Sequence, residues 1–259
     1  MGKNKLAKFA RMEELPNVLQ YPYGRLRDEG FPYRGRWHEF FGNTNPIVLE
    51  LGCGKGEYTV GMARLMPDRN FVGVDIKGAR MYTGATEAHD TGIGNAAFLR
   101  TSIELLDRFF APGEVSEIWI TFPDPQMRKV NKRLTGTRLT ALYRSIAGAD
   151  ATVNLKTDSP FLYAYTRMMA QSNGLTIEAD TDDLHGAGST AMADSLRNIL
   201  THYERQWLAR GLTIKYLRYR LGDGVLEEPE DADSIADDTY RSYSRGYIQM
   251  PAMLENNRK

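Results

Sequence analysis

The chain has 259 residues, of which 42% are hydrophobic and 25% charged, and its formal net charge is zero. This length suits one α/β domain with extensions, and no apolar run approaches the roughly 18 residues of a transmembrane helix. A single cysteine, Cys53, excludes an internal disulfide and a multi-cysteine metal site, and the N-terminus lacks the apolar core of a signal peptide, so we expect a cytoplasmic protein.

Short apolar runs rich in β-forming residues recur along the chain and alternate with segments of helical length. The runs cover residues 47–52, 70–76, 96–102, 117–123, 151–157, 175–181 and 213–221. The first five are almost continuously apolar, as expected for strands buried on both faces of a parallel sheet. The alternation predicts an α/β fold with a doubly wound, mostly parallel seven-stranded sheet of the Rossmann-like type, with the last two strands as an antiparallel edge.

Charge is distributed unevenly along the chain. Residues 1–36 carry eight Lys and Arg against four acids, residues 126–149 carry six and no acid, and residues 222–259 carry nine acids against four bases. The two basic regions create a positive local field that the net charge conceals, although any one such run is commonly only solvated surface. We therefore expect a basic N-terminal extension (1–44), a central domain (45–221) and a flexible acidic C-terminal tail (222–259).

A glycine loop follows the first predicted strand, in the order Glu50-Leu-Gly52-Cys-Gly54-Lys-Gly56, and Asp75 ends the second strand. Glycines let the backbone turn tightly and approach a ligand, and an acid at the second strand end accepts ribose hydroxyls. The spacing differs from the G-x-G-x-x-G of dinucleotide sites, and a carboxylate at Glu50 suits an ammonium group. The set favours S-adenosylmethionine over NAD, against the simpler alternative of a tight turn.

Asp124 lies between Pro123 and Pro125, directly after the fourth predicted strand. Because ligands bind at the carboxyl ends of parallel strands, and because proline restricts the residue before it, Asp124 is a preorganised carboxylate beside the cofactor. The alternative is a turn with a solvated acid. Four bases follow within nine residues: Arg128, Lys129, Lys132 and Arg133.

Taken together, the E-x-G-x-G-x-G loop, the F-P-D-P sequence, the following N-K-R and the later Thr201-His-Tyr-Glu204 resemble the tRNA (guanine-N7)-methyltransferase family. The resemblance spans roughly residues 45–221 and identifies a divergent member, since Gln126 stands where Trp is usual. It implies a class I S-adenosylmethionine-dependent enzyme that methylates N7 of a guanosine in the variable loop of tRNA.

The resemblance also implies roles for individual residues. Asp124 matches the catalytic acid. The cofactor positions are Glu50, Gly52, Gly54, Gly56 and Asp75, with Ser102 as a polar contact near the adenine. The substrate positions are Arg128, Asp158, Thr201 and Glu204, and we expect Lys132 and Arg133 to hold RNA phosphates.

Two alternatives stay open at this stage. One is a class I methyltransferase that acts on another RNA, a protein or a small molecule, and the basic run after Asp124 argues against the last. The other is a non-catalytic RNA-binding protein with this fold, against which the intact cofactor residues argue. The four histidines show no metal-ligand spacing, so no metal is expected, and the protein is expected to be a monomer or homodimer.

Overall fold

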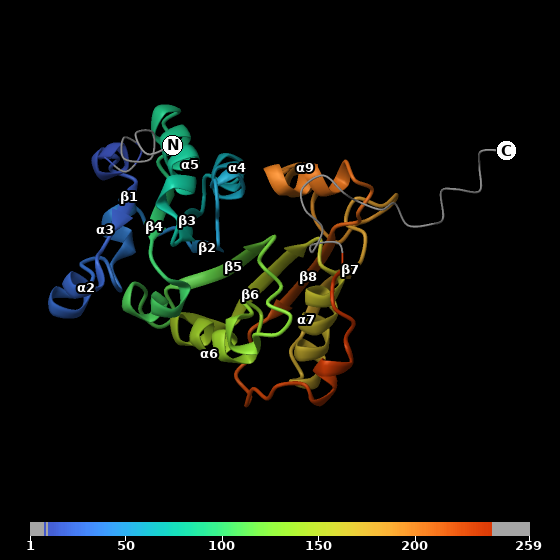
Figure 1. Cartoon of the computed structure of the whole chain (residues 1–259). Coiled ribbons are helices and arrows are strands. Elements are labelled where there is room, and N and C mark those ends of the chain that lie inside the picture. Colours follow the sequence, from blue (N-terminus) through green and yellow to red (C-terminus); the bar gives the residue numbers. More distant parts are fainter. Residues whose placement is uncertain (1–7, 9, 240–259) are drawn as a thin grey trace.

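The computed structural model describes residue 8 and residues 10–239, and these residues form a mostly parallel sheet with helices on both faces (Figure 1). The sheet order is β1-β4-β3-β2-β5-β6-β8-β7. The strands are β1 (Val18–Gln20), β2 (Ile47–Leu51), β3 (Asn70–Asp75), β4 (Ala96–Arg100), β5 (Val115–Thr121), β6 (Ala147–Thr157), β7 (Ile177–Thr181) and β8 (Lys215–Arg220).

The predicted fold class is confirmed, and each of the seven predicted strands is present. Strand β8 runs antiparallel to both β6 and β7, as expected for the edge. The described part of the sheet has an eighth strand, β1, which pairs in parallel with β4. This strand lies within the segment that we expected to be a separate N-terminal extension.

Helices fill the connections between the strands. The α-helices from residue 23 onward in the described part are α2 (Tyr23–Glu29), α3 (Trp37–Phe41), α4 (Glu57–Leu65), α5 (Gly78–Asp90), α6 (Thr137–Ile146), α7 (Pro160–Ser172), α8 (Asp194–Arg197) and α9 (His202–Leu208), and residues 10–14 are also helical. Three short 3-10 helices are η1 (Ile103–Arg108), η2 (Val130–Lys132) and η3 (Glu230–Ser234). None of the helices in the described ranges is long and apolar enough to cross a membrane.

The sheet is buried on both faces by two hydrophobic clusters. Residues of α6 and α7 pack on one face, and residues of α4 and α5 pack on the other. The N-terminal region belongs to the first cluster, because Trp37 is fully buried and stacks on Phe110 with ring centroids 5.0 Å apart. Its aromatic residues therefore stabilise the domain directly.

The order in which successive strands are added to the sheet reverses between β2 and β5, which are parallel neighbours at its centre. After β2 the chain continues to β3 on one side, and after β5 it continues to β6 on the other. Such a switch point leaves a crevice at the carboxyl ends of the two strands. The glycine loop and the Pro-Asp-Pro sequence both begin at this crevice.

The start of the acidic C-terminal segment, residues 222–239, lies along α7 (red in Figure 1). Near the end of α7, Asn173 Nδ2 donates to the carbonyl of Glu227 over 2.9 Å, and the Glu227 N–H donates to Asn173 Oδ1 over 2.7 Å. At the start of the same helix, Asp238 is buried. The prediction of a flexible tail is wrong for these residues, and residues 240–259 lie outside the described part.

Candidate active site

The glycine loop requires left-handed backbone at three alternate residues. Gly52, Gly54 and Gly56 have φ values of 76°, 56° and 74°, a region that other residues seldom adopt. A Cβ on Gly56 would also lie 2.5 Å from the Phe98 ring, whereas a Cβ on Gly52 would meet nothing within 4 Å. The loop therefore packs closely at its end and leaves open space at its start, where a ligand can approach the backbone.

Asp75 fixes this loop and lines a cavity beside it. Its Oδ2 accepts the Gly54 N–H at 3.0 Å, and its Oδ1 accepts the Lys77 N–H at 2.8 Å. Each carboxylate oxygen has a second lone pair, so Asp75 retains acceptor capacity toward the cavity.

The first cavity, of about 220 Å³, lies between the glycine loop and the start of α6. Three of the predicted cofactor residues, Gly52, Asp75 and Ser102, line it, and its other lining residues are Ile76, Thr101, Ile103, Glu104, Lys132, Leu134 and Leu139. The exposed Ile76 side chain and the apolar residues opposite suit a flat ring, and Asp75 suits a ribose. This arrangement fits an adenosine group.

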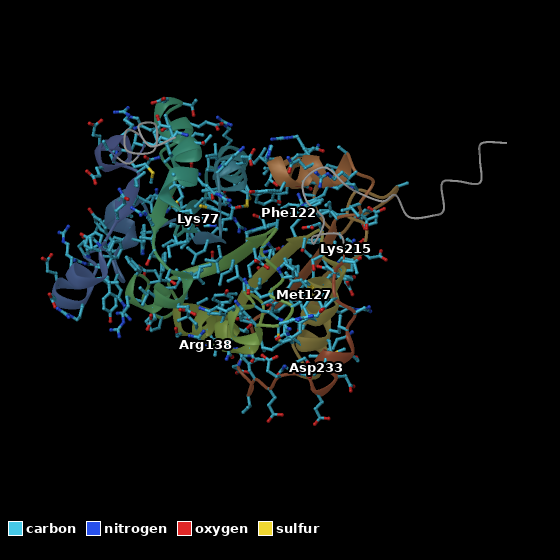
Figure 2. The ribbon with its side chains drawn as sticks, viewed as in Figure 1. Lys77, Phe122, Met127, Arg138, Lys215 and Asp233 are labelled. Carbon is cyan, nitrogen blue, oxygen red and sulfur yellow. The ribbon has the colours of Figure 1, made fainter. Side chains whose placement is uncertain are left out.

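A second cavity, of about 120 Å³, lies on the other side of Gly52, which lines both. It is lined by the glycine loop together with Glu57, Arg80, Thr121, Phe122, Thr201 and Tyr203. Figure 2 shows Phe122 close to α9, the helix that begins after Thr201. The two cavities thus meet at the glycine loop, with the carboxyl end of β5 beside the second.

Glu50 lines neither of these cavities, because its side chain is 2% exposed and points beneath the loop. Its Oε2 accepts the Thr59 N–H at 2.8 Å and the Thr59 hydroxyl, and its Oε1 accepts the Thr121 hydroxyl at 2.7 Å. Burial raises the pKa of Glu50 to about 7, against the opposing effect of these hydrogen bonds. Glu50 joins α4 to the end of β5, so the structure does not support the predicted direct contact with an ammonium group.

The Pro-Asp-Pro sequence is held in an unusual backbone conformation. Phe122 and Gln126 have φ values of 50° and 49°, which cost energy for residues other than glycine. The Phe122 N–H donates to the Lys156 carbonyl at 2.8 Å, and the Gln126 N–H donates to Asp124 Oδ1 at 3.1 Å. Asp124 is exposed, so the loop presents its carboxylate to solvent two residues after Phe122 of the second cavity.

The basic run divides into two kinds of residue. The side chain of Arg128 is 90% exposed and that of Lys132 is 61% exposed, as phosphate contacts require. Lys132 also lines the first cavity, with its Nζ 3.6 Å from Glu104 Oε1.

Arg133 is instead 3% exposed. It donates from Nε to the Gln126 carbonyl at 3.2 Å and from Nη2 to the Met127 carbonyl at 2.5 Å, and its guanidinium lies 4.3 Å from the Tyr165 ring centroid. The prediction that Arg133 binds phosphate is therefore wrong: its charge is used to hold the loop after Asp124 against α7.

The three remaining predicted substrate residues lie at different depths. Thr201 lines the second cavity, and its hydroxyl accepts the Glu204 N–H at 3.2 Å as the N-cap of α9. Glu204 is fully buried and accepts from Lys156 Nζ and from His185 Nε2, each at 2.8 Å. Asp158 is also fully buried, directly after β6. Neither acid lines either of the two cavities.

Sequence reasoning missed Glu57, which follows the last loop glycine. Glu57 Oε2 accepts the His202 N–H at 2.9 Å, and its Oε1 accepts from Arg205 Nη2 at 3.1 Å. It therefore joins the start of α4 to the start of α9 across the second cavity. Its position beside the loop was a signal, but its partners, 145 and 148 residues away, were not predictable from spacing.

Cys53 is buried, and burial raises the pKa of its thiol well above the usual value, which makes it a poor nucleophile. Among the described residues, no group of three or more His, Cys, Asp or Glu side chains is placed to hold a metal ion.

Comparison with known proteins identifies the class first. Residues 44–217 match the model of a family described as putative methyltransferases. Solved structures share the fold: the 16S rRNA methyltransferase KamB superposes with a TM-score of 0.54 and 13% identity, over 73% of this chain and 94% of that one. An antibiotic-related methyltransferase superposes with a TM-score of 0.52 and 16% identity, over 74% and 94%. The protein is a methyltransferase with a class I fold.

Sequence relatives identify the family. The chain is 56% identical to the tRNA (guanine-N(7)-)-methyltransferase of Porphyromonas gingivalis, over 90% of this chain and 96% of the relative. It is 54% identical to the enzyme of the same name from Bacteroides thetaiotaomicron, over 95% and 96%. The chain belongs to the tRNA (guanine-N(7)-)-methyltransferase family, and the predicted resemblance is confirmed.

Proposed function

We propose that this protein transfers a methyl group from S-adenosylmethionine to N7 of a guanosine in the variable loop of tRNA. The observation that carries the proposal is the meeting of the two cavities at Gly52, beside a rigid loop that presents Asp124. One cavity suits an adenosine, and the other leaves room where a base can reach the methyl group. The names of the relatives support tRNA as the substrate.

The residues at the first cavity fit S-adenosylmethionine. Asp75 would accept from the ribose hydroxyls, Ser102 would provide a polar contact to the adenine, and Gly52 and Gly54 leave space for the ligand. When bound, the cofactor supplies an electrophilic methyl group on a sulfonium. Glu50 would act indirectly, because its three hydrogen bonds hold α4, the helix after the glycine loop, to the end of β5.

Methyl transfer to guanine N7 needs no general base, since N7 has an in-plane lone pair and carries no proton. The protein must orient the base and stabilise the positive charge that develops on the purine. The Asp124 carboxylate suits both tasks, because it can accept from the N1–H and N2–H edge of guanine. Thr201, which lines the second cavity, would contact the substrate, while the buried Glu204 supports α9 from behind through Lys156.

Arg128 and Lys132 would hold the RNA backbone, because both are exposed cations within eight residues of Asp124. Such contacts position a nucleic acid without reading its sequence. We also propose a cytoplasmic location, which a tRNA substrate supports.

The decisive experiment is incubation of the protein with methyl-labelled S-adenosylmethionine and unmodified tRNA, followed by mapping of N7-methylguanosine. We expect label at a variable-loop guanosine, and none in a tRNA that carries adenosine at that position. Unmodified 16S rRNA tests action on another RNA. Label in rRNA alone would overturn the tRNA assignment, and no label in any RNA, despite measured cofactor binding, would favour another substrate class.

A further inference from the structure

The C-terminal segment of residues 227–238 contacts the elements that carry the Asp124 loop, and none of the residues assigned to the site so far comes from it. Two of its carboxylates make these contacts: Asp238 at the start of α7, and Glu228 with Tyr165 in the middle of α7 and Thr137 of α6. Of the acids in this segment, Asp238 is buried, whereas Glu228 and the others are exposed, including Asp233, which Figure 2 labels on η3. The segment thus uses particular acids for packing.

Asp238 joins the start of α7 to the loop after Asp124. Its side chain is 7% exposed; Oδ1 accepts the Phe161 N–H at 3.0 Å, and Oδ2 accepts the Ser159 hydroxyl at 2.5 Å. Its own N–H points to Met127 Sδ at 3.1 Å. A carboxylate at a helix N-terminus is stabilised by the free N–H groups there, so this contact is well defined.

Glu228 holds the far end of the same loop. Its Oε1 accepts the Thr137 hydroxyl at 2.5 Å at the start of α6, and its Oε2 accepts the Tyr165 hydroxyl at 2.7 Å. The Tyr165 ring lies against Arg133, which binds the carbonyls of Gln126 and Met127. The segment between Gln126 and Thr137 is therefore fixed at both ends by acids from the C-terminal segment.

We infer that Asp238 is a positioning residue for methyl transfer. Its carboxylate anchors residue 238 to Ser159 and Phe161, and this places its backbone N–H against Met127 Sδ, three residues after Asp124. The side chain thus acts on the loop indirectly, by fixing the position of its own backbone. The positive φ at Gln126 is unfavourable by itself and persists only where the surroundings impose it. Arg133, through the carbonyls of Gln126 and Met127, and Asp238, through the Met127 sulfur, supply those surroundings. This inference rests on the proposed function, because it concerns the same reaction.

The test compares Asp238→Ala with Asp233→Asn, an exposed acid five residues earlier in the same segment. Single-turnover methylation of tRNA is measured at saturating cofactor and RNA, with the cofactor Kd determined by calorimetry. We expect Asp238→Ala to slow the single-turnover rate at least tenfold while the cofactor Kd stays within twofold. Asp238→Asn, which keeps the shape and one acceptor, should restore part of the rate. Asp233→Asn should match the wild type.

A purely structural role would lower the melting temperature of Asp238→Ala without slowing methyl transfer by the folded protein. A rate within twofold of the wild type in a folded variant would therefore overturn the inference. Should Asp238→Ala fail to fold, the same comparison is made with Asp238→Asn, whose rate should fall below that of the wild type. A wild-type rate together with unchanged hydrogen exchange of residues 126–133 in this variant would overturn the inference.

Hydrogen exchange separates this inference from the proposed function, because it needs no activity. We expect the amides of residues 126–133 to exchange faster in the Asp238 variant than in Asp233→Asn, while those of β2 and β5 are unchanged. Equal exchange in the loop would overturn the positioning role even if the wild type methylates tRNA. Faster loop exchange in a protein that methylates no tRNA would count against the proposed function alone.

Discussion

Lys156 and Glu204 form an ion pair in which both side chains are fully buried, with Lys156 Nζ 2.8 Å from Glu204 Oε1. His185 Nε2 lies at the same distance from that oxygen. Lys156 belongs to β6, and Glu204 belongs to α9, whose N-cap Thr201 lines the second cavity. The pair therefore attaches the wall of the candidate active site to the central sheet.

Removing one partner of this pair should destabilise the protein strongly. Lys156→Met leaves the Glu204 carboxylate buried without its lysine, and breaking a buried pair in this way costs about 3–5 kcal/mol. The double variant Lys156→Met/Glu204→Gln should recover part of the loss, because no buried charge remains. Urea unfolding measures both. A loss below about 1 kcal/mol in the single variant would show that the pair behaves like a surface ion pair.

Asp124→Asn should abolish most methyl transfer while keeping the fold and the cofactor affinity. Asn retains the shape and an acceptor for the Gln126 N–H but removes the charge that stabilises the cationic product. Loss of one preorganised electrostatic contact costs on the order of 10²–10³ in rate. Single-turnover rates with saturating tRNA and cofactor check this, with the exposed Asp150→Asn as the control. A rate within about threefold of the wild type corresponds to a change of under 1 kcal/mol in activation free energy. It would indicate that Asp124 is only a turn residue.

Asp75→Ala should weaken binding of S-adenosylmethionine by about 1.5–3 kcal/mol, the range for hydrogen bonds to a charged group. The variant loses the proposed ribose contact and the acceptor for the Gly54 N–H. Calorimetry without RNA measures the effect. Ser102→Ala, which removes one neutral contact at the same cavity, should cost less. Unchanged affinity in Asp75→Ala would refute the assignment of the first cavity.

The exposed basic residues and the buried Arg133 should affect the salt dependence of tRNA binding differently. Arg128→Ala/Lys132→Ala should reduce the slope of log affinity for tRNA against log salt by up to about 2. Arg133→Ala should lower the melting temperature and leave the slope nearly unchanged, because Arg133 is buried. Filter binding at several salt concentrations gives the slopes. An equal decrease in slope in both variants would show that Arg133 reaches the RNA after all.

Glu50 should make stability depend on pH in a defined window. Its pKa is about 7 in the folded protein and near 4.5 when exposed, so the unfolded chain loses the proton first as pH rises. The stabilisation that the protonated Glu50 gives the folded state is therefore fully present below pH 4.5 and is lost as pH rises through about 7. The free energy of unfolding should fall by about 3 kcal/mol over this range. Urea unfolding of the wild type and Glu50→Gln across pH 4.5–8 measures the difference. Parallel profiles would contradict it.

The sheet was predictable from sequence because each buried strand is a nearly continuous apolar run. Strand β1 was not, since its three half-buried residues carry too short a pattern. The glycine loop and Asp75 were found because their chemistry depends on local spacing. The Asp124 loop was recognised by its prolines, whereas its positive φ values became visible only in the structure.

The roles of Arg133 and Asp238 depend on contacts between distant parts of the chain. Arg133 looks like its three basic neighbours in sequence, and its burial results from Tyr165 on another helix. Asp238 looks like the other acids of its segment, and its contact with Met127 spans 111 residues. The pattern of charged residues along the sequence does not show which charged side chains are buried and which are exposed to solvent.

The two edges of the sheet are formed by β1, which has three residues, and β7, which has five. Exposed strand edges are templates on which other chains can add strands, and short or charged edges limit this. Within β7, Glu178 is paired with both Arg218 and Arg220 of β8, which places charge along that edge. Both edges therefore disfavour edge-to-edge aggregation, so the central strands are protected while the loops at their carboxyl ends stay exposed for the proposed substrate.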